Sequence, residues 1–304
     1  MRILLFGASG QVGTELRRSL APLGELVVAT RTGVMPDGAP CMTADFDAPQ
    51  TLPAVIDQVA PDIVVNAAAY TAVDRAEEDA TAAFRANAEA PSRIAVACAA
   101  RDVLLVHYST DYVFDGTGAR PYREDDPVAP LGVYGASKLA GELAIQASGA
   151  RHLIFRTAWV YAAHGHNFLR TMLRLGRERD ELRVVADQVG APTPAALIAE
   201  VTAQALRQPP VRFGLWHLVA GGQTNWHGFA EAIFAGAQQR GLIDRMPRVV
   251  PIATADYPTA AKRPAFSVLD TTRLQQDFEI RPVAWQDGLG SVLDDIARTA
   301  DSAP

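Results

Sequence analysis

The sequence has few cysteines and few charged side chains, and it has no long apolar run. Its two cysteines, Cys41 and Cys98, lie far apart and show none of the spacings that bind metals or build disulfide frameworks. Free thiols in a reducing compartment are the simplest interpretation. The apolar start MRILLF is too short to span a membrane, and no cleavage pattern follows it. We therefore expect a cytoplasmic protein without a membrane span.

Basic residues are not clustered either. The net charge is −6, and charged residues make up 20% of the chain. A nucleic-acid surface or an anionic membrane requires concentrated Lys and Arg, so we expect neither partner, although a local basic pocket for one phosphorylated ligand remains open. The histidines show no metal-ligand spacing and are expected to be structural or exposed. They include His107, His164, His166, His217 and His227.

Strand-like and helix-like segments alternate through the first half of the chain. The predicted strands are residues 2–6, 26–30, 63–66 and 104–109, and the predicted helices between them include residues 11–20 and 80–100. The strands are too apolar to have a wetted face. This pattern is typical of a parallel sheet covered by helices on both sides, an α/β fold of the doubly wound, Rossmann type.

The second half of the chain has a different pattern. A helix over 132–147 and a strand from residue 152 continue the alternation, and further helices are predicted at 167–179, 194–207 and 226–240. The connections between these later helices are richer in Pro and Gly. We predict a sheet domain in residues 1–161 and a smaller, substrate-binding lobe in residues 162–304, with some segments returning to the sheet domain.

The first predicted strand runs directly into GASGQVG, which opens a helix. A strand, a glycine turn and a helix N-terminus in this order present free backbone N–H groups and a positive dipole end to a pyrophosphate. A tight turn without a ligand is the alternative. We predict that a dinucleotide contacts Gly7, Gly10, Gln11, Val12 and Gly13.

The end of the second predicted strand bears on the choice of dinucleotide. An acidic residue there would bind the adenosine ribose and repel a 2′-phosphate, but the strand ends in Ala-Thr-Arg. Because Arg31 can pair with that phosphate, the sequence favours NADPH and leaves NADH use open. Asp45, with Phe46 beside it, is expected on the adenine side.

Two further segments follow predicted strands and should meet the same ligand, because ligands of a doubly wound sheet bind at the carboxyl ends of its strands. Small residues suited to passing beside a cofactor follow the strand at 63–66, namely Ala67, Ala68 and Ala69. The strand at 104–109 leads into a cluster of hydroxyls and a carboxylate, which includes Tyr108, Thr110 and Asp111.

The segment VYGASKLAGE places Tyr134 four residues before Lys138, on one face of a helix. A phenol has a pKa of about 10, and a nearby cation favours its ionised form. At about 4 Å and an effective dielectric near 20 the interaction is about 4 kcal/mol, before burial opposes it. The pair is either catalytic, with Tyr134 as a general acid, or a chance pair on a solvated face.

Together, GASGQVG, NAAA, STD and YGASK resemble the extended short-chain dehydrogenase/reductases. Longer blocks resemble one family among them, the dTDP-4-dehydrorhamnose reductases, and they cover almost the whole chain. They include IVVNAAAYTAVDRAE, VHYSTDYVFDGTG, HLIFRTAWVYA and YPTAAKRPAFSVLDTTRL. The resemblance implies NAD(P)H-dependent reduction of the C4 ketone of dTDP-4-dehydro-β-L-rhamnose to dTDP-β-L-rhamnose, the last step of dTDP-rhamnose biosynthesis.

The same resemblance implies roles for individual residues. Tyr134 would be the acid, Lys138 would tune it and hold the nicotinamide ribose, and Thr110 would take the place where many relatives carry serine. Asp111 would contact the sugar, and Trp159 would offer its ring face to the deoxyhexose. Core packing is the alternative for Trp159.

The resemblance also implies a diphosphate site. Lys262 and Arg263 would bind the substrate diphosphate, with a solvated surface pair as the alternative. Some members of the family form magnesium-bridged dimers through clustered carboxylates. The predicted helix at 194–207 offers only Glu200, so we expect no metal here, and both a monomer and a homodimer remain open.

Two other functions compete with this interpretation. A nucleotide-sugar epimerase or dehydratase of the same superfamily would share Tyr134 and Lys138 but keep its dinucleotide tightly bound. A non-catalytic, dinucleotide-binding regulatory subunit would not need Tyr134, Lys138 and Thr110 together.

Overall fold

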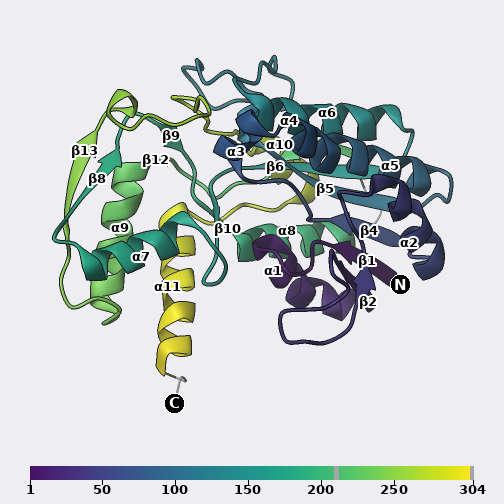
Figure 1. The fold of residues 1–304 in the computed structure, drawn as a ribbon, viewed down its shortest axis with the longest axis horizontal. Coiled ribbons are helices and arrows are strands. Elements are labelled where there is room, and N and C mark those ends of the chain that lie inside the picture. The colour runs from purple at the N-terminus through teal and green to yellow at the C-terminus, as the bar shows by residue number, and fades with distance from the viewer. Residues whose placement is uncertain (209–211, 302–304) are drawn as a thin grey trace.

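A parallel sheet forms the centre of the computed structural model, which describes residues 1–208 and 212–301. The sheet has seven strands in the order β11-β6-β5-β4-β1-β2-β3, and every neighbouring pair is parallel (Figure 1). The strands are β1 (Arg2–Phe6), β2 (Glu25–Thr30), β3 (Met42–Thr43), β4 (Ile63–Asn66), β5 (Leu104–Thr110), β6 (His152–Thr157) and β11 (Gly214–His217). The predicted Rossmann-type fold is confirmed.

Helices cover both faces of this sheet (Figure 1). Alternate residues of β1 belong to two separate apolar clusters, Ile3 and Leu5 to one and Leu4 and Phe6 to the other. Helices α1 (Gln11–Leu20) and α8 (Ala195–Arg207) pack in the first cluster, and α2 (Leu52–Val59) and α5 (Ala90–Ala99) pack in the second. The remaining helices of this part are α3 (Val73–Glu78), α4 (Ala80–Phe84) and α6 (Val133–Ala147).

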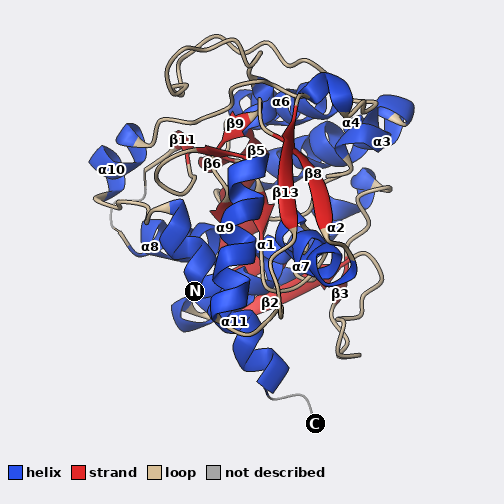
Figure 2. Ribbon diagram, turned by 90° about the vertical axis from the view of Figure 1, so that its left-hand side faces the viewer, coloured by secondary structure: helices blue, strands red, loops and turns tan. Residues whose placement is uncertain are grey.

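A smaller lobe lies beside the sheet, with the parallel strand pair β8 and β13 against helices α7 and α9 (Figure 2). Its main elements are α7 (Phe168–Glu178), β8 (Glu181–Val185), α9 (Trp226–Gln239), β13 (Arg248–Ile252) and α11 (Trp285–Asp301). Helix α10 (Thr272–Phe278) packs instead against β11 of the sheet, where Phe278 contacts Trp216. The short strands are β7 (Val160–Tyr161), β9 (Val189–Gly190), β10 (Thr193–Pro194) and β12 (Thr224–Asn225). Short helical turns are η1 (Ala21–Leu23), η2 (Pro49–Thr51), η4 (Asp111–Val113) and η5 (Thr254–Asp256).

The lobe and the sheet share apolar packing. One cluster contains Leu5 of β1 together with Phe229 and Phe234 of α9, and β11 brings the chain back to pair with β6. The division into domains at residue 161 stays a prediction. Among the helices of the described residues, none is long and apolar enough to cross a membrane.

The predicted continuous helix at 80–100 is wrong in one respect. The chain forms α4, then a π-helical segment η3 (Arg85–Glu89), then α5. Pro91 lies in the first turn of α5, and in an α-helix its ring would meet the carbonyl of Asn87. The wider turn avoids this clash. It also leaves the buried Asn87 side chain bonded to the backbone of Tyr70 and to the Ser137 hydroxyl.

Candidate active site

A cleft of about 760 Å³ opens at the carboxyl ends of the sheet strands and reaches the start of α9. Its size suits a cofactor or a small-molecule ligand. It brings together most of the residues predicted from the sequence. Those that line it are Gly7, Gly10, Gln11, Val12, Arg31, Phe46, Ala67, Ala68, Ala69, Tyr108, Thr110, Asp111, Tyr134, Lys138, Trp159 and Arg263. Gly13, Asp45 and Lys262 do not line it.

The glycine turn has the geometry that a phosphate group requires. Gly7 has a φ of 77°, and a Cβ there would lie 2.6 Å from the backbone nitrogen of Ala68. A Cβ on Gly13 would overlap the carbonyl oxygen of Gly7, so this glycine sets the approach of α1 to the turn. Gly10 is the N-cap of α1, no side chain caps the helix, and no acidic residue lies in its first turn. The free amides can therefore receive an anion.

Arg31 lies at the rim of the cleft, with 71% of its side chain exposed. Its guanidinium is 3.9 Å from Asp45 Oδ1 and 3.8 Å from Asp47 Oδ2. An anion that binds Arg31 therefore has to compete with two carboxylates. Phe46, between these two aspartates, is buried and packs edge-on against Phe6.

Tyr134 and Lys138 lie on α6 and both line the cleft. Lys138 Nζ donates a hydrogen bond to the backbone oxygen of Tyr108 at 2.6 Å, and the residue is only 2% exposed. Burial lowers the pKa of Lys138 to about 8, and the charge of Glu142 opposes that shift.

Burial also dominates at Tyr134, where it raises the pKa to about 12, and an interaction with the Thr110 hydroxyl acts in the opposite direction. From the sequence, we expect the charge of Lys138 to lower the pKa of Tyr134 towards neutral pH. This expectation is not met, because the pKa is raised. Desolvation outweighs the attraction, and the ammonium is bonded to a carbonyl oxygen instead. At neutral pH the phenol keeps its proton, which is the form a general acid needs.

Thr110 ends β5 and Asp111 begins η4, beside this pair. The Thr110 hydroxyl donates to Asp111 Oδ1 at 3.0 Å and accepts from the backbone N–H of Tyr112 at 3.2 Å. Asp111 is 1% exposed, and its Oδ2 has no hydrogen-bond partner among the described residues. Burial raises the pKa of Asp111 to about 6, against the hydroxyls of Ser267 and Thr110. Asp111 therefore lines the cleft as a buried carboxyl group with acceptor capacity left on Oδ2.

A buried ion pair fixes α6 against the sheet. Glu142, one turn beyond Lys138, accepts hydrogen bonds of 2.9 and 2.7 Å from the guanidinium of Arg156 on β6. Both side chains are almost fully buried, and the Arg156 guanidinium also lies over the Phe114 ring. Removing one partner of such a pair typically costs about 3–5 kcal/mol, so the position of α6 is strongly constrained.

The predicted substrate residues are placed unequally. Arg263 lines the cleft and forms a 2.7 Å ion pair with Asp74, whereas Lys262 is exposed and lies outside the cleft. That these two neighbours act together on a diphosphate stays a prediction. The N–H of Ala261 and the guanidinium of Arg263 both bind Asp74, which ties this segment to α3.

The cleft-lining residues that sequence reasoning missed include two from the lobe. His166 was expected to be structural or exposed; it is exposed, but it reaches the cleft from the loop before α7. Trp226, the first residue of α9, stacks on Trp159 with ring centroids 3.6 Å apart. Both belong to the lobe, and no local spacing in the sequence indicates that the lobe folds back onto the sheet edge there.

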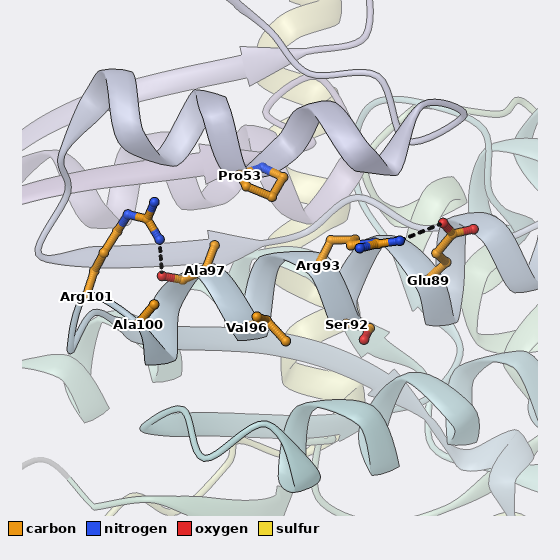
Figure 3. A pocket seen from close by; sticks show the side chains of 8 residues that line it. All are labelled: Pro53, Glu89, Ser92, Arg93, Val96, Ala97, Ala100 and Arg101. Carbon is orange, nitrogen blue, oxygen red and sulfur yellow. Dashed lines mark hydrogen bonds and ion pairs between the residues drawn. The ribbon is translucent and has the colours of Figure 1, made fainter.

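A separate depression of about 410 Å³ lies on the outer surface between α2 and α5 (Figure 3). It is lined by Pro53 and by residues 89–101, including Arg93, whose guanidinium is 4.0 Å from Glu89. It shares no residue with the cleft. Within the described residues, no group of three or more His, Cys, Asp or Glu side chains could hold a metal ion.

The burial of Lys138 predicts a stability cost that depends on pH. Its pKa falls from 10.5 to about 8 on folding, so the folded protein binds fewer protons at this site than the unfolded chain within that window. The penalty is present below pH 8 and fades as the pH rises. Replacing Lys138 with Met removes the buried charge but leaves the backbone carbonyl of Tyr108 without its hydrogen-bond donor. The lost hydrogen bond reduces the gain in stability by about 1 kcal/mol.

We therefore expect Lys138→Met to raise the free energy of unfolding by about 1–3 kcal/mol at pH 7, with the gain shrinking towards pH 10. Urea unfolding at both pH values measures this. Lys262→Met, at the exposed lysine, is the matched control and should change little. A strongly destabilised Lys138→Met protein at pH 7, or a gain that grows with pH, would contradict the expectation.

Comparison with known proteins agrees with this geometry. A family model described as the RmlD substrate binding domain matches residues 1–298. The dTDP-4-dehydrorhamnose reductase of Burkholderia thailandensis is 48% identical over 307 residues, covering 97% of this chain and 99% of the relative. The enzyme of the same name from Escherichia coli K12 is 46% identical over 302 residues, covering 98% and 99%.

Solved structures give the same result. The dTDP-4-dehydrorhamnose reductase of Bacillus anthracis, in complex with NADP, superposes with a TM-score of 0.87 at 32% identity, covering 97% of this chain and 99% of that one. A UDP-glucose 4-epimerase from Thermus thermophilus, in complex with NAD, reaches 0.81 at 22% identity, covering 99% and 100%, which shows the fold alone. The family inferred from the sequence is confirmed: the chain belongs to the RmlD substrate-binding domain family.

Proposed function

We propose that this protein reduces the C4 ketone of dTDP-4-dehydro-β-L-rhamnose to dTDP-β-L-rhamnose with NAD(P)H. The observation that carries the proposal is the meeting of Tyr134, Lys138 and Thr110 in one cleft with a glycine turn suited to a pyrophosphate. The identity of 46–48% with dTDP-4-dehydrorhamnose reductases over nearly the full length supports the choice of substrate.

The residues of the cleft fit a dinucleotide. Gly7, Gly10 and the first amides of α1 would hold its pyrophosphate, while Ala67 and Ala68 leave room beside it. A reduced nicotinamide, when bound, supplies the hydride for the ketone carbon.

The protein's own side chains manage the ketone oxygen, on which negative charge grows. The Tyr134 hydroxyl gives this oxygen its proton, so the product is an alcohol and the tyrosine becomes a phenolate. The Lys138 ammonium stabilises that phenolate by its charge, and the Thr110 hydroxyl hydrogen-bonds the substrate oxygen or Tyr134. Asp111 accepts a hydrogen bond from a sugar hydroxyl through its unpaired oxygen, and Arg263 binds the diphosphate.

The proposed activity is tested by adding dTDP-4-dehydro-L-rhamnose and following the absorbance of the reduced nicotinamide. We expect a loss of absorbance and the formation of dTDP-L-rhamnose in equal amounts. No turnover with either NADPH or NADH would reject the reductase function. A purified protein that retains a bound, non-exchanging dinucleotide would instead favour an epimerase or dehydratase.

Substituting the proposed acid tests the role of Tyr134. Tyr134→Phe removes the proton donor and leaves the ring, so kcat should fall by about 10²- to 10⁴-fold while NADPH binding changes little. Steady-state kinetics and a fluorescence titration with NADPH measure the two effects. Tyr161→Phe, at a buried tyrosine outside the cleft, is the control. A fully active Tyr134→Phe protein would rule out the proton-donor role.

Charge reversal tests the proposed preference for NADPH. Arg31→Asp exchanges attraction for repulsion at the 2′-phosphate, so KM for NADPH should rise about 10- to 100-fold, well above any change for NADH. Asp47→Asn removes a competing carboxylate, so it should lower KM for NADPH. Arg18→Asp, on the exposed side of α1, is the control. Equal effects of Arg31→Asp on both cofactors would count against the assignment.

A further inference from the structure

Two tryptophans from different parts of the fold lie in contact inside the cleft. Trp159 follows β6 of the central sheet, and Trp226 begins α9 of the lobe. Their rings are nearly parallel, with centroids 3.6 Å apart and an interplanar angle of 6°. Since both residues line the cleft, the indole pair forms part of its wall.

The other face of Trp159 is covered as well. A Cβ on Gly190 would lie 2.6 Å from Cε2 of Trp159 and 2.8 Å from both Cζ2 and Nε1. Such similar distances to three bonded atoms place Gly190 above the ring plane, not at its edge. With Trp226 on one face and Gly190 on the other, Trp159 offers the cleft only its rim. The ring face that the sequence analysis assigned to a deoxyhexose is therefore occupied.

The two indoles are held in different ways. The indole N–H of Trp226 donates to Gln188 at 3.2 Å, Gln188 in turn donates to Thr254 at 3.0 Å, and Phe168 packs on Trp226. Trp159 has a φ of 47°, a left-handed conformation that is strained for a bulky side chain. Strained backbone of this kind is concentrated at ligand clamps and switch regions. The stack thus joins the indole of Trp226, which is held by a hydrogen bond, to the indole of Trp159, whose backbone is strained.

The following inference rests on the proposed function. We propose that Trp226 covers, in the free protein, the face of Trp159 that receives the deoxyhexose of the substrate, and that binding of the sugar separates the two indoles. A deoxyhexose presents an apolar C–H surface that can replace the buried indole contact. The diphosphate of the nucleotide part is charged and is drawn to Arg263, so we assign the replacement of the indole contact to the sugar. Trp226 is thus a specificity-determining residue, because a sugar must compete with it for Trp159.

The stack can be observed directly by circular dichroism. Two indoles in contact couple their strong far-ultraviolet transitions, and where the two transition dipoles are rotated relative to one another the coupling gives an exciton couplet, which disappears when the rings separate. We expect the couplet in the free protein. It should be absent in Trp226→Phe and retained in Trp285→Phe, since Trp285 lies in the lobe outside the cleft. A far-ultraviolet spectrum with the same indole coupling in Trp226→Phe as in the unsubstituted protein would overturn the proposal.

The ligand series then separates the sugar from the nucleotide. In the NADPH-loaded protein, saturating dTDP-L-rhamnose should remove most of the couplet, down to the amplitude of Trp226→Phe, whereas dTDP should leave it unchanged. Calorimetry confirms that each ligand is bound. A couplet retained with dTDP-L-rhamnose bound, or lost with dTDP alone, would overturn the proposal while the proposed activity stands. If dTDP-L-rhamnose does not bind at all, the proposed activity and this inference both fail.

Discussion

Parallel strands buried on both faces can offer side chains to a ligand only where the strands end. In this protein β1, β4, β5 and β6 end at the same edge, so the glycine turn, the alanines after β4 and Thr110 at the end of β5 meet there. The rest of the cleft follows from this constraint. Helix α6 adds Tyr134 and Lys138 because it packs against the end of β5, and the Glu142–Arg156 ion pair ties it to β6.

Desolvation is the second force that shapes the site. Tyr134, Lys138 and Asp111 all line the cleft, and burial shifts the pKa of each in the direction that favours its uncharged form. For the phenol this means a retained proton, and for the carboxyl a pKa of about 6. Burying the ammonium of Lys138 costs folding free energy, and the hydrogen bond to the Tyr108 carbonyl and the charge of Glu142 reduce that cost. The groups expected to carry the chemistry are thus ionisable side chains whose burial costs folding free energy.

Much of the fold and of the site could be predicted because the signals are local. Strand periodicity, the spacing of Gly7, Gly10 and Gly13, and the i, i+4 relation of Tyr134 to Lys138 all lie within a few residues. The failures depend on contacts between distant segments. The π-helical turn before Pro91 arises where Asn87 meets Tyr70 and Ser137. Trp226 reaches Trp159 only because the lobe folds back onto the sheet, and no single segment encodes that approach.

The burial of Lys138 has a chemical consequence beyond the reaction. The sequence contains only two lysines, Lys138 and Lys262, and all its other basic side chains of this class are arginines, which cannot lose their proton. Lys262 is exposed on the surface, whereas Lys138 lines a cleft and burial lowers its pKa to about 8, so more of it is a free amine near neutral pH than of a lysine with the ordinary pKa of about 10.4. An amine-directed reagent shaped like a nucleotide would therefore label the cleft of this protein against an almost blank background.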